Sequence, residues 1–303
     1  MALQNQLAQR KPKTGITTFL NSVNVLTNID QALGKDNRQR FITGVISAVN
    51  NNESLKECTN QSILSGALLG ESLKLSPSPQ LGHYYLVPFN DKSKGKVAQF
   101  QLGYKGYIQL AIRSGYYKKL NVLAIKEGEL VKFDPLNEEI SVNLVEDDTE
   151  REALPTIGYY AMFEYQNGFK KAMYWSREKM MSHADKYSMA FSAEKYRDLL
   201  EGKIPQGDMW KYSSFWYKDF DGMAYKTMLR QLISKWGIMS IEMQTAMDKD
   251  MAAINEDGSV DYVDNSYDAE PMIANPATGE VIEGKAEPQT EADPTAGFFD
   301  SEE

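Results

Sequence analysis

The spacing of hydrophobic residues predicts that the first quarter of the chain is helical. Apolar residues recur at helical spacing over residues 17–33, 36–49 and 59–75. Three consecutive asparagines at 50–52 interrupt the pattern, as expected where a helix ends. We therefore expect three helices that form a small N-terminal unit. A loose polar arm over residues 1–15 precedes them.

A different hydrophobic period after residue 75 predicts strands. His83–Phe89 and Val97–Tyr104 are apolar runs of strand length, separated by a lysine-rich loop, and a short helix follows the second run. Asn167 and Gly168 separate two further runs and predict a type I′ hairpin turn. The other segments with a strand pattern are residues 120–125, 130–133, 140–145, 156–165 and 169–175.

Helical spacing returns in the second half of the chain. An apolar stripe that includes Trp236 predicts a long helix over residues 220–237. Shorter helices are predicted over 176–187 and 193–200, and the acidic segment 146–152 is expected to be a loop. These elements predict an α+β fold, in which a small curved antiparallel sheet with β-hairpins is packed by helices. We expect a folded core over residues 16–247.

Residues 248–303 differ sharply in charge from the rest of the chain. The 303-residue protein has a formal net charge of −9, but this segment alone carries 16 acidic residues against two lysines. It also contains Pro and Gly and few large apolar residues, so we expect a mostly disordered acidic tail. The remaining residues 1–247 are mildly basic, and a net charge of +7 falls on residues 92–132. The overall acidity therefore does not exclude a nucleic-acid partner.

Several kinds of chemistry lack their sequence signals. The chain contains no G-x-x-x-x-G-K-[ST], G-x-S-x-G or H-E-x-x-H motif and no paired C-x-x-C. We expect no ATP, no metal-dependent chemistry and no catalytic role for His83 or His183. Cys58 is the only cysteine, which excludes intramolecular disulfides, and we expect it to be a buried or half-buried thiol that does not act as a nucleophile. No apolar run approaches the roughly 20 residues that span a bilayer, and no signal peptide is evident, so we expect a cytoplasmic protein.

A cationic hairpin and the helix after it are the strongest candidates for ligand binding. Lys105, Gln109 and Arg113 recur every four residues and therefore share one face of the predicted helix. The loop Ser93–Lys96 is either a phosphate clamp or a solubilising hairpin tip. Phe191 lies in a polar segment, where an exposed aromatic ring could insert between bases. The DNA-binding candidates are Lys94, Lys96, Gln99, Gln101, Tyr104, Lys105, Gln109, Arg113, Lys186, Ser188, Phe191, Lys211, Lys226 and Arg230.

Three segments in order carry a family resemblance. LKLSPSPQLGHYYLVPF, QFQLGYKGYIQLAIRSG and MAYKTMLRQLISKW resemble the RecT/Redβ family of phage-type recombinases, and the resemblance covers about residues 15–245. SHADKYSMAF resembles the basic, serine-containing segment of the family. It differs in having His183, Ala184 and Asp185 where the family pattern leads us to expect more arginine.

The resemblance implies an ATP-independent protein that anneals single-stranded DNA in homologous recombination. It implies binding of single-stranded DNA and of the annealed duplex, and self-assembly into a ring or a helical filament. The implied partners are a phage exonuclease and the host single-strand-binding protein, contacted by the C-terminal part. The tail over 248–303 is then either a docking arm, a competitor for the DNA groove or merely solvated chain.

Two other functions remain open at this stage. The carboxylates at 134, 138, 139 and 146–148 resemble a metal-dependent nuclease cluster, although they fall in predicted turns. A structural phage assembly protein, whose basic patch binds an acidic partner, is the other alternative.

Overall fold

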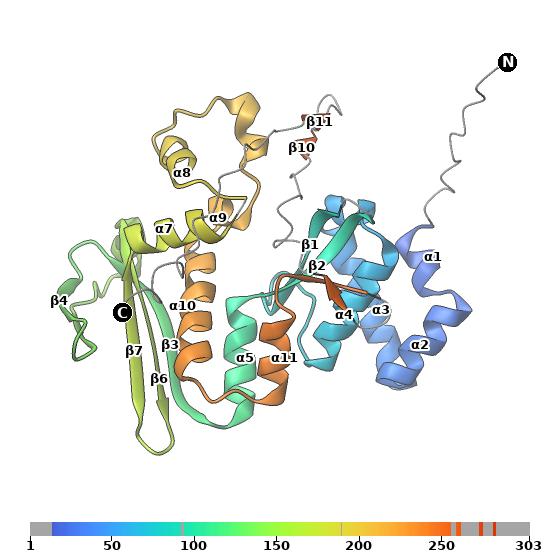
Figure 1. Cartoon of the computed structure of the whole chain (residues 1–303), viewed down its shortest axis with the longest axis horizontal. Coiled ribbons are helices and arrows are strands. Elements are labelled where there is room, and N and C mark those ends of the chain that lie inside the picture. Colours follow the sequence, from blue (N-terminus) through green and yellow to red (C-terminus); the bar gives the residue numbers. More distant parts are fainter. Residues whose placement is uncertain are drawn as a thin grey trace, which may run out of the picture. The chain divides into compact units, whose positions relative to one another are not determined.

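The structure is a computed structural model of the whole chain (Figure 1). It describes residues 14–91, 94–188, 190–255 and 259–261, and the residue pairs 273–274 and 281–282. Met1–Pro271 form one compact unit and Met272–Glu303 a second. In the second unit, β10 (Ile273–Ala274) pairs antiparallel with β11 (Val281–Ile282). Most of the expected arm and of the expected disordered tail lies outside the described residues.

The first part of the chain is helical, as the sequence predicts. α1 (Ile16–Leu20) and α2 (Val23–Leu33) replace the single helix expected there. The break falls at Ser22, whose hydroxyl donates to the Phe19 carbonyl at 2.8 Å, because serine side chains compete with helical hydrogen bonds. α3 (Lys35–Asn50), a short 3₁₀ helix η1 (Glu53–Glu57) and α4 (Asn60–Ser72) follow. Cys58 is buried, as predicted.

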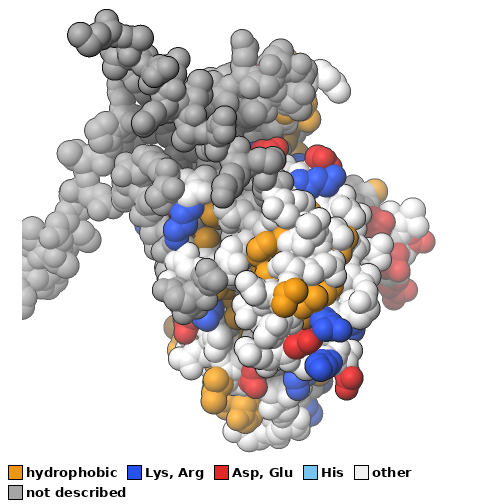
Figure 2. All heavy atoms as spheres, turned by 90° about the vertical axis from the view of Figure 1, so that its right-hand side faces the viewer, with side chains coloured by type: hydrophobic (Ala, Val, Ile, Leu, Met, Phe, Trp, Pro, Cys, Tyr) orange, Lys and Arg blue, Asp and Glu red, His pale blue; other side chains and the backbone are white. Residues whose placement is uncertain are grey.

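The surface around the N-terminal helices carries charges of both signs. Figure 2 shows the right-hand side of Figure 1, where Lys and Arg side chains are interspersed with acidic and hydrophobic ones. Ion pairs form within this unit: Arg38 lies 2.9 Å from Asp30, and Lys56 lies 2.6 Å from Glu53. The visible part of this face is therefore not a basic surface.

The first sheet is built on the predicted hairpin. β1 (Tyr84–Asp91) pairs antiparallel with β2 (Gly95–Leu102), and α4 packs against both strands. A Cβ atom at Gly66 would lie 2.7 Å from the Leu86 side chain, so a larger residue at this position would force the end of that side chain to move. β2 also pairs with β8 (Ala252–Ile254), which in turn pairs with β9 (Val260–Asp261).

That pairing moves the boundary of the folded core. The core was expected to end at residue 247, but Asp250, Ala252, Ala253 and Ile254 are all buried. They follow α11 (Ile241–Asp248), which packs near α5. The boundary drawn from composition is therefore too early, because charge and chain composition do not show that a short strand adds to a distant hairpin.

A second, three-stranded antiparallel sheet has the order β3-β6-β7. Its strands are β3 (Tyr117–Lys126), β6 (Thr156–Tyr165) and β7 (Lys170–Ser176). The β6–β7 hairpin is confirmed, but its turn is not type I′: Gly168 has a φ of 86°, whereas Asn167 has no positive φ. A separate hairpin joins β4 (Leu130–Asp134) to β5 (Glu139–Val142).

Helices cover one face of this sheet and complete a mixed α+β fold, as predicted (Figure 1). α5 (Tyr104–Ser114) and α10 (Phe220–Trp236) pack against each other and against the sheet. One hydrophobic core runs from Leu20 of α1 to Ile254 of β8. The remaining elements are α6 (Asp148–Ala153), α7 (Arg177–Tyr187), α8 (Ala193–Leu200), η2 (Gln206–Lys211) and α9 (Phe215–Lys218).

Two local expectations are corrected. The acidic segment expected as a loop contains α6, because Asp147 accepts the Glu150 N–H at 2.9 Å and caps the helix, while Arg151 anchors it to Glu129. Trp236 belongs to the expected buried stripe of the long helix but is 52% exposed. The Lys171 ammonium group lies 3.6 Å from the centre of its ring, so a cation covers part of this indole.

Candidate nucleic-acid interface

The polar face of α5 is the part of the expected interface that the structure leaves most accessible. The helix is fixed by buried Tyr107 and Leu110 on its other side. Lys105 and Gln109 are exposed, and the Lys105 ammonium group lies 5.9 Å from the centre of the half-buried Tyr104 ring. Lysine beside an aromatic ring is an arrangement that suits phosphate and base contacts.

Arg113, at the end of the same face, is partly committed within the fold. Its guanidinium donates to the carbonyl oxygens of Leu73 at 2.7 Å and Lys74 at 3.4 Å. It therefore caps the C-terminal end of α4, where carbonyl groups lack helical partners. The side chain is still exposed, but its removal would disturb the joint between α4 and α5.

The cations of the β1–β2 hairpin contact the body of the protein. Lys94 Nζ donates to the Asn255 side chain at 2.7 Å, and Lys96 forms an ion pair with Glu57. Residues 92 and 93 of the loop lie outside the described residues. The clamp therefore stays a prediction, and DNA would have to compete with these contacts.

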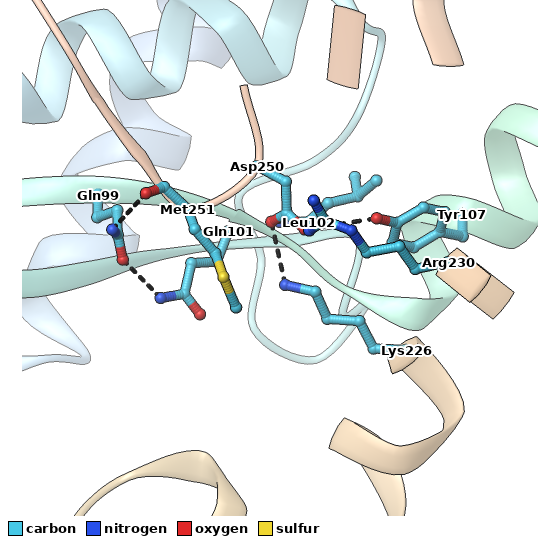
Figure 3. A network of polar contacts seen from close by, with 8 residues as sticks. All are labelled: Gln99, Gln101, Leu102, Tyr107, Lys226, Arg230, Asp250 and Met251. Carbon is cyan, nitrogen blue, oxygen red and sulfur yellow. Dashed lines mark hydrogen bonds and ion pairs between the residues drawn. The ribbon is translucent and has the colours of Figure 1, made fainter. Parts of the chain in front are cut away.

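Four of the expected contacts, Gln99, Gln101, Lys226 and Arg230, belong to a polar network that is partly or fully buried (Figure 3). Gln99 is fully buried and donates to the Met251 carbonyl, and its side-chain oxygen accepts from Gln101 at 2.7 Å. Lys226 is 5% exposed. The expectation that Gln99 and Lys226 lie on an accessible surface is therefore wrong.

Asp250 is the centre of this network, and sequence reasoning missed it. Its carboxylate is fully buried and lies 3.0 Å from Lys226 Nζ and 2.9 Å from Arg230 Nη1. It also accepts the Leu102 N–H at 2.8 Å and the Tyr107 hydroxyl at 3.4 Å. Burial, and then the charge of Asp250, raises the pKa of Tyr107 well above its ordinary value, so this hydroxyl stays protonated. Lys226 and Arg230 are thus held by a carboxylate, although 40% of the Arg230 side chain is exposed.

The segment after α7 folds differently from the exposed loop that was expected. Phe191 is 6% exposed, and its ring packs 5.0 Å from Tyr217 and 5.8 Å from Trp216. Asp185 accepts the Ala193 N–H at 2.7 Å and so fixes the start of α8. The expectation that Phe191 is exposed is therefore wrong, because the aromatic residues of α8, α9 and α10 enclose its ring.

The other candidates of this region lie at or near the surface. Lys186 is exposed, 5.3 Å from the ring centre of Tyr187, and Ser188 is half-buried. Lys211 is exposed and forms a 2.8 Å ion pair with Asp208. Their contact with DNA stays a prediction.

Comparison with known proteins decides the family. The model of the RecT family matches residues 39–263, which is most of the chain. The chain belongs to the RecT family. It is 25% identical over 292 residues to "Protein RecT" of Escherichia coli, covering 93% of each chain. It is 37% identical over 252 residues to "Uncharacterized protein YqaK" of Bacillus subtilis, covering 83% of this chain and 75% of that protein. Membership places the chain among DNA-binding proteins of recombination and strand annealing, a family not known for bond-breaking chemistry.

Three of the six carboxylates that suggested a nuclease have local structural roles in this RecT-family fold. Asp134 accepts hydrogen bonds from the Asn137 side chain and from the backbone N–H groups of Asn137 and Leu136, and these bonds lower the pKa of Asp134. Glu138 pairs with Lys171, and Asp147 caps α6. In the part of the chain that the structure describes, no group of three His, Cys, Asp or Glu side chains could hold a metal ion. Among the same residues, no helix has the length and apolar character needed to cross a membrane.

The structure also gathers lysines that were not among the candidates. Lys118, Lys119 and Lys170 lie 2.6, 4.0 and 3.6 Å from the carboxylate of Glu164, which is almost fully buried. The hydrogen bond from Lys118 and the charges of all three lysines lower the pKa of Glu164, although its burial acts in the opposite direction. The paired lysines at 118–119 and 170–171 were the available sequence signal, but which face of the sheet they occupy depends on strand register.

Proposed function

We propose that this RecT-family protein binds single-stranded DNA, pairs it with a complementary strand without ATP and holds the duplex within an oligomer. The observation that carries the proposal is the exposed face of α5 in a member of this family. Lys105 and Gln109 are exposed on this face, and the half-buried Tyr104 ring lies beside Lys105. Lysine neutralises phosphate, and the ring offers a stacking surface without sequence preference. Annealing needs no covalent step, which agrees with the missing ATP-binding and hydrolase motifs.

The partner assignments belong to the same proposal. Self-association into a ring or filament would place many weak phosphate contacts along one strand, which raises the overall affinity. A phage exonuclease would supply resected ends, and the host single-strand-binding protein would occupy the substrate strand. The acidic residues after Asp261 are the proposed contact region for these proteins, because their charge disfavours binding to DNA.

The test is annealing of two complementary, fluorescently labelled oligonucleotides by the full-length protein without nucleotide. We expect ATP-independent annealing that slows steeply with salt, because each neutralised phosphate adds about 0.7 to the slope of log affinity against log salt. Lys105→Glu should weaken both single-strand binding and annealing. Lys35→Glu, an equal change of charge at an exposed residue of α3, is the matched control.

Three results would contradict the proposal. They are a requirement for ATP, annealing that is indifferent to salt, and equal behaviour of Lys105→Glu and Lys35→Glu. Lys105 is preferred to Arg113 for this test because the Arg113 guanidinium also caps α4.

A further inference from the structure

The face of the β3-β6-β7 sheet that points away from α10 is only partly covered. Tyr159 of β6 contacts the rings of Phe220 and Tyr225 on α10, so alternate residues of β6 point to the opposite side. On that opposite side Phe133 of β4 packs 5.0 Å from Tyr174, so the β4–β5 hairpin covers one end of the face. The rest of the face carries no further layer among the described residues.

The uncovered part consists of two cross-strand rows. One row contains Lys119, Glu164 and Lys170, and the next contains Asn121, Met162 and Ala172. The lysines of the outer strands are about 10 Å apart across the sheet, given a spacing of about 4.8 Å between strands. Lys119 and Lys170 keep 65% and 64% of their side chains exposed, so both remain accessible to a ligand although they lie near Glu164.

Two depressions meet on this face at Met162. One, of 480 Å³, lies between the sheet and the β4–β5 hairpin and is lined by Lys132, Lys170 and Lys171 together with Tyr160 and Met162. The other, of 440 Å³, follows the edge strand β3 and is lined by Lys118, Lys119, Asn121 and again Met162. Ile112 of α5 also lines it, so this depression continues around the edge of the sheet. The combined surface, which we call the sheet groove, has five lysines and two glutamates among its lining residues and an apolar floor at its centre. Lys171 is held by Glu138 and by the Trp236 ring, so the other four lysines are the candidates for phosphate contacts.

This combination matches the chemistry of a nucleic-acid strand. The lysines at the rim would neutralise phosphates, and half-buried Met162 and Tyr160 on the floor would contact the faces of unstacked bases. A sheet face that is exposed only to water needs no apolar floor, and an apolar protein partner would not require so many lysines around it.

We infer that the sheet groove is a capture site for the incoming second DNA strand, distinct from the site around Lys105 and Gln109 on α5. The inference rests on the proposed function, since only an annealing protein must hold a second strand. Capture raises the local concentration of that strand near the first one before pairing. Because Lys105 is not among the residues that line the groove, the two strands need not compete for the same cations.

The experiment measures the two binding events separately with the full-length protein. The protein is first saturated with a labelled oligonucleotide, and a second, non-complementary strand with a different label is then titrated in. Base pairing therefore cannot contribute to binding of the second strand. The test variant is Lys119→Ala/Lys170→Ala, which removes two exposed side chains and leaves the short Lys118–Glu164 ion pair in place. Lys195→Ala/Lys203→Ala is the matched control, because both lysines are at least half-exposed and each forms one ion pair.

We expect the test variant to bind the first strand as the wild type does and to lose affinity for the second. Raising the salt concentration from about 50 to 200 mM weakens second-strand binding. Because the test variant lacks two phosphate contacts, this weakening should be about sevenfold smaller than in the wild type. Annealing with a complementary second strand should slow at low concentrations of that strand and recover at saturating concentrations. Glu164→Gln should raise the affinity for the second strand, because it removes the negative charge that lies between the lysines.

Different failures have different meanings. Second-strand binding equal to that of the control variant overturns the inference, and so does an equal loss of first-strand and second-strand binding, which would make the groove the primary site. A wild-type protein that binds neither strand refutes the proposed function itself. Circular dichroism melting of each variant identifies loss of folding. If the double lysine variant does not fold, Glu164→Gln still tests the inference, because it should raise the affinity for the second strand.

Discussion

Replacing the buried Asp250 carboxylate is the sharpest test of how the C-terminal segment stabilises the fold. Asp250→Asn keeps the size of the side chain but removes its charge. The Lys226 ammonium group, with 7% of its side chain exposed, then loses its 3.0 Å partner in the interior. Loss of one partner of a buried ion pair costs about 3–5 kcal/mol, because the remaining charge is left without compensation. Arg230 adds less, since 40% of its side chain is exposed and water can solvate it.

Two further variants separate the terms of this cost. Asp250→Ala also removes the acceptor of the Leu102 N–H, and an unpaired buried N–H costs about another 1–3 kcal/mol. Asp250→Asn/Lys226→Met removes the uncompensated charge together with the carboxylate. Its loss of unfolding free energy should therefore be smaller than the sum of the losses in the two single variants, by about 1–3 kcal/mol.

The assay is urea unfolding at a fixed protein concentration, since self-association changes apparent stability. Glu127→Ala, a change at an exposed carboxylate in a turn, is the control and should alter stability by no more than about 0.5 kcal/mol. A loss below about 1 kcal/mol for Asp250→Asn, or strict additivity in the double variant, would refute the reasoning. Either result would mean that the segment after α11 detaches from β2 and that Lys226 reaches water.

Two further predictions concern stability. Phe191→Ala should lower the free energy of urea unfolding by about 3–5 kcal/mol, because it leaves a cavity in an aromatic cluster. Tyr187→Ala, which removes an exposed ring in the same region, should lower it far less. Equal losses would contradict the burial of Phe191. Burial alone would raise the pKa of Glu129, but hydrogen bonds from Arg151 and from the N–H groups of Lys126 and Val145 lower it. Glu129 therefore stabilises the fold above its unfolded pKa of about 4.3, and this contribution disappears as the pH falls through its lower folded pKa. Glu129→Gln should be less stable at pH 7 and should lose less stability on acidification than the wild type, and a parallel pH dependence would exclude Glu129 as the responsible group.

The local elements could be predicted because their causes are local in sequence. Helical spacing places α3, α7, α8 and α10 within a few residues of their bounds, and alternation places β6. The hairpin at 167–168 was predictable, but its turn type depends on the φ of Asn167, which an Asn-Gly pair alone does not determine. The exposed face of α5 was likewise predictable, because Lys105, Gln109 and Arg113 follow the helical repeat.

The interior partners of polar residues could not be predicted, because they are distant in sequence. Asp250 is 148 residues from Leu102, and it looked like part of a solvated acidic tail. Lys226 looked like a surface cation at the flank of an apolar stripe, but it is buried and pairs with Asp250, which lies 24 residues further along the chain. Phe191 had polar neighbours, and helices that follow later in the chain enclose it. Composition describes what a segment prefers on average, whereas these residues are placed by specific pairings.

The ion pairs change how much positive charge is available to DNA. Lys226 and Arg230 share Asp250, and Lys96 is paired with Glu57, so the cations counted along the sequence overstate what a phosphate can reach. Exposed lysines are still present at Lys105 on α5 and at Lys119 and Lys170 in the sheet groove, although the last two lie near Glu164. A protein that brings two polyanions together must lower the repulsion between them, and a single small patch of free cations would be saturated by the first strand. Two separate basic surfaces avoid this competition. Annealing should therefore depend more steeply on salt than binding of the first strand does, because it draws on phosphate contacts at both surfaces.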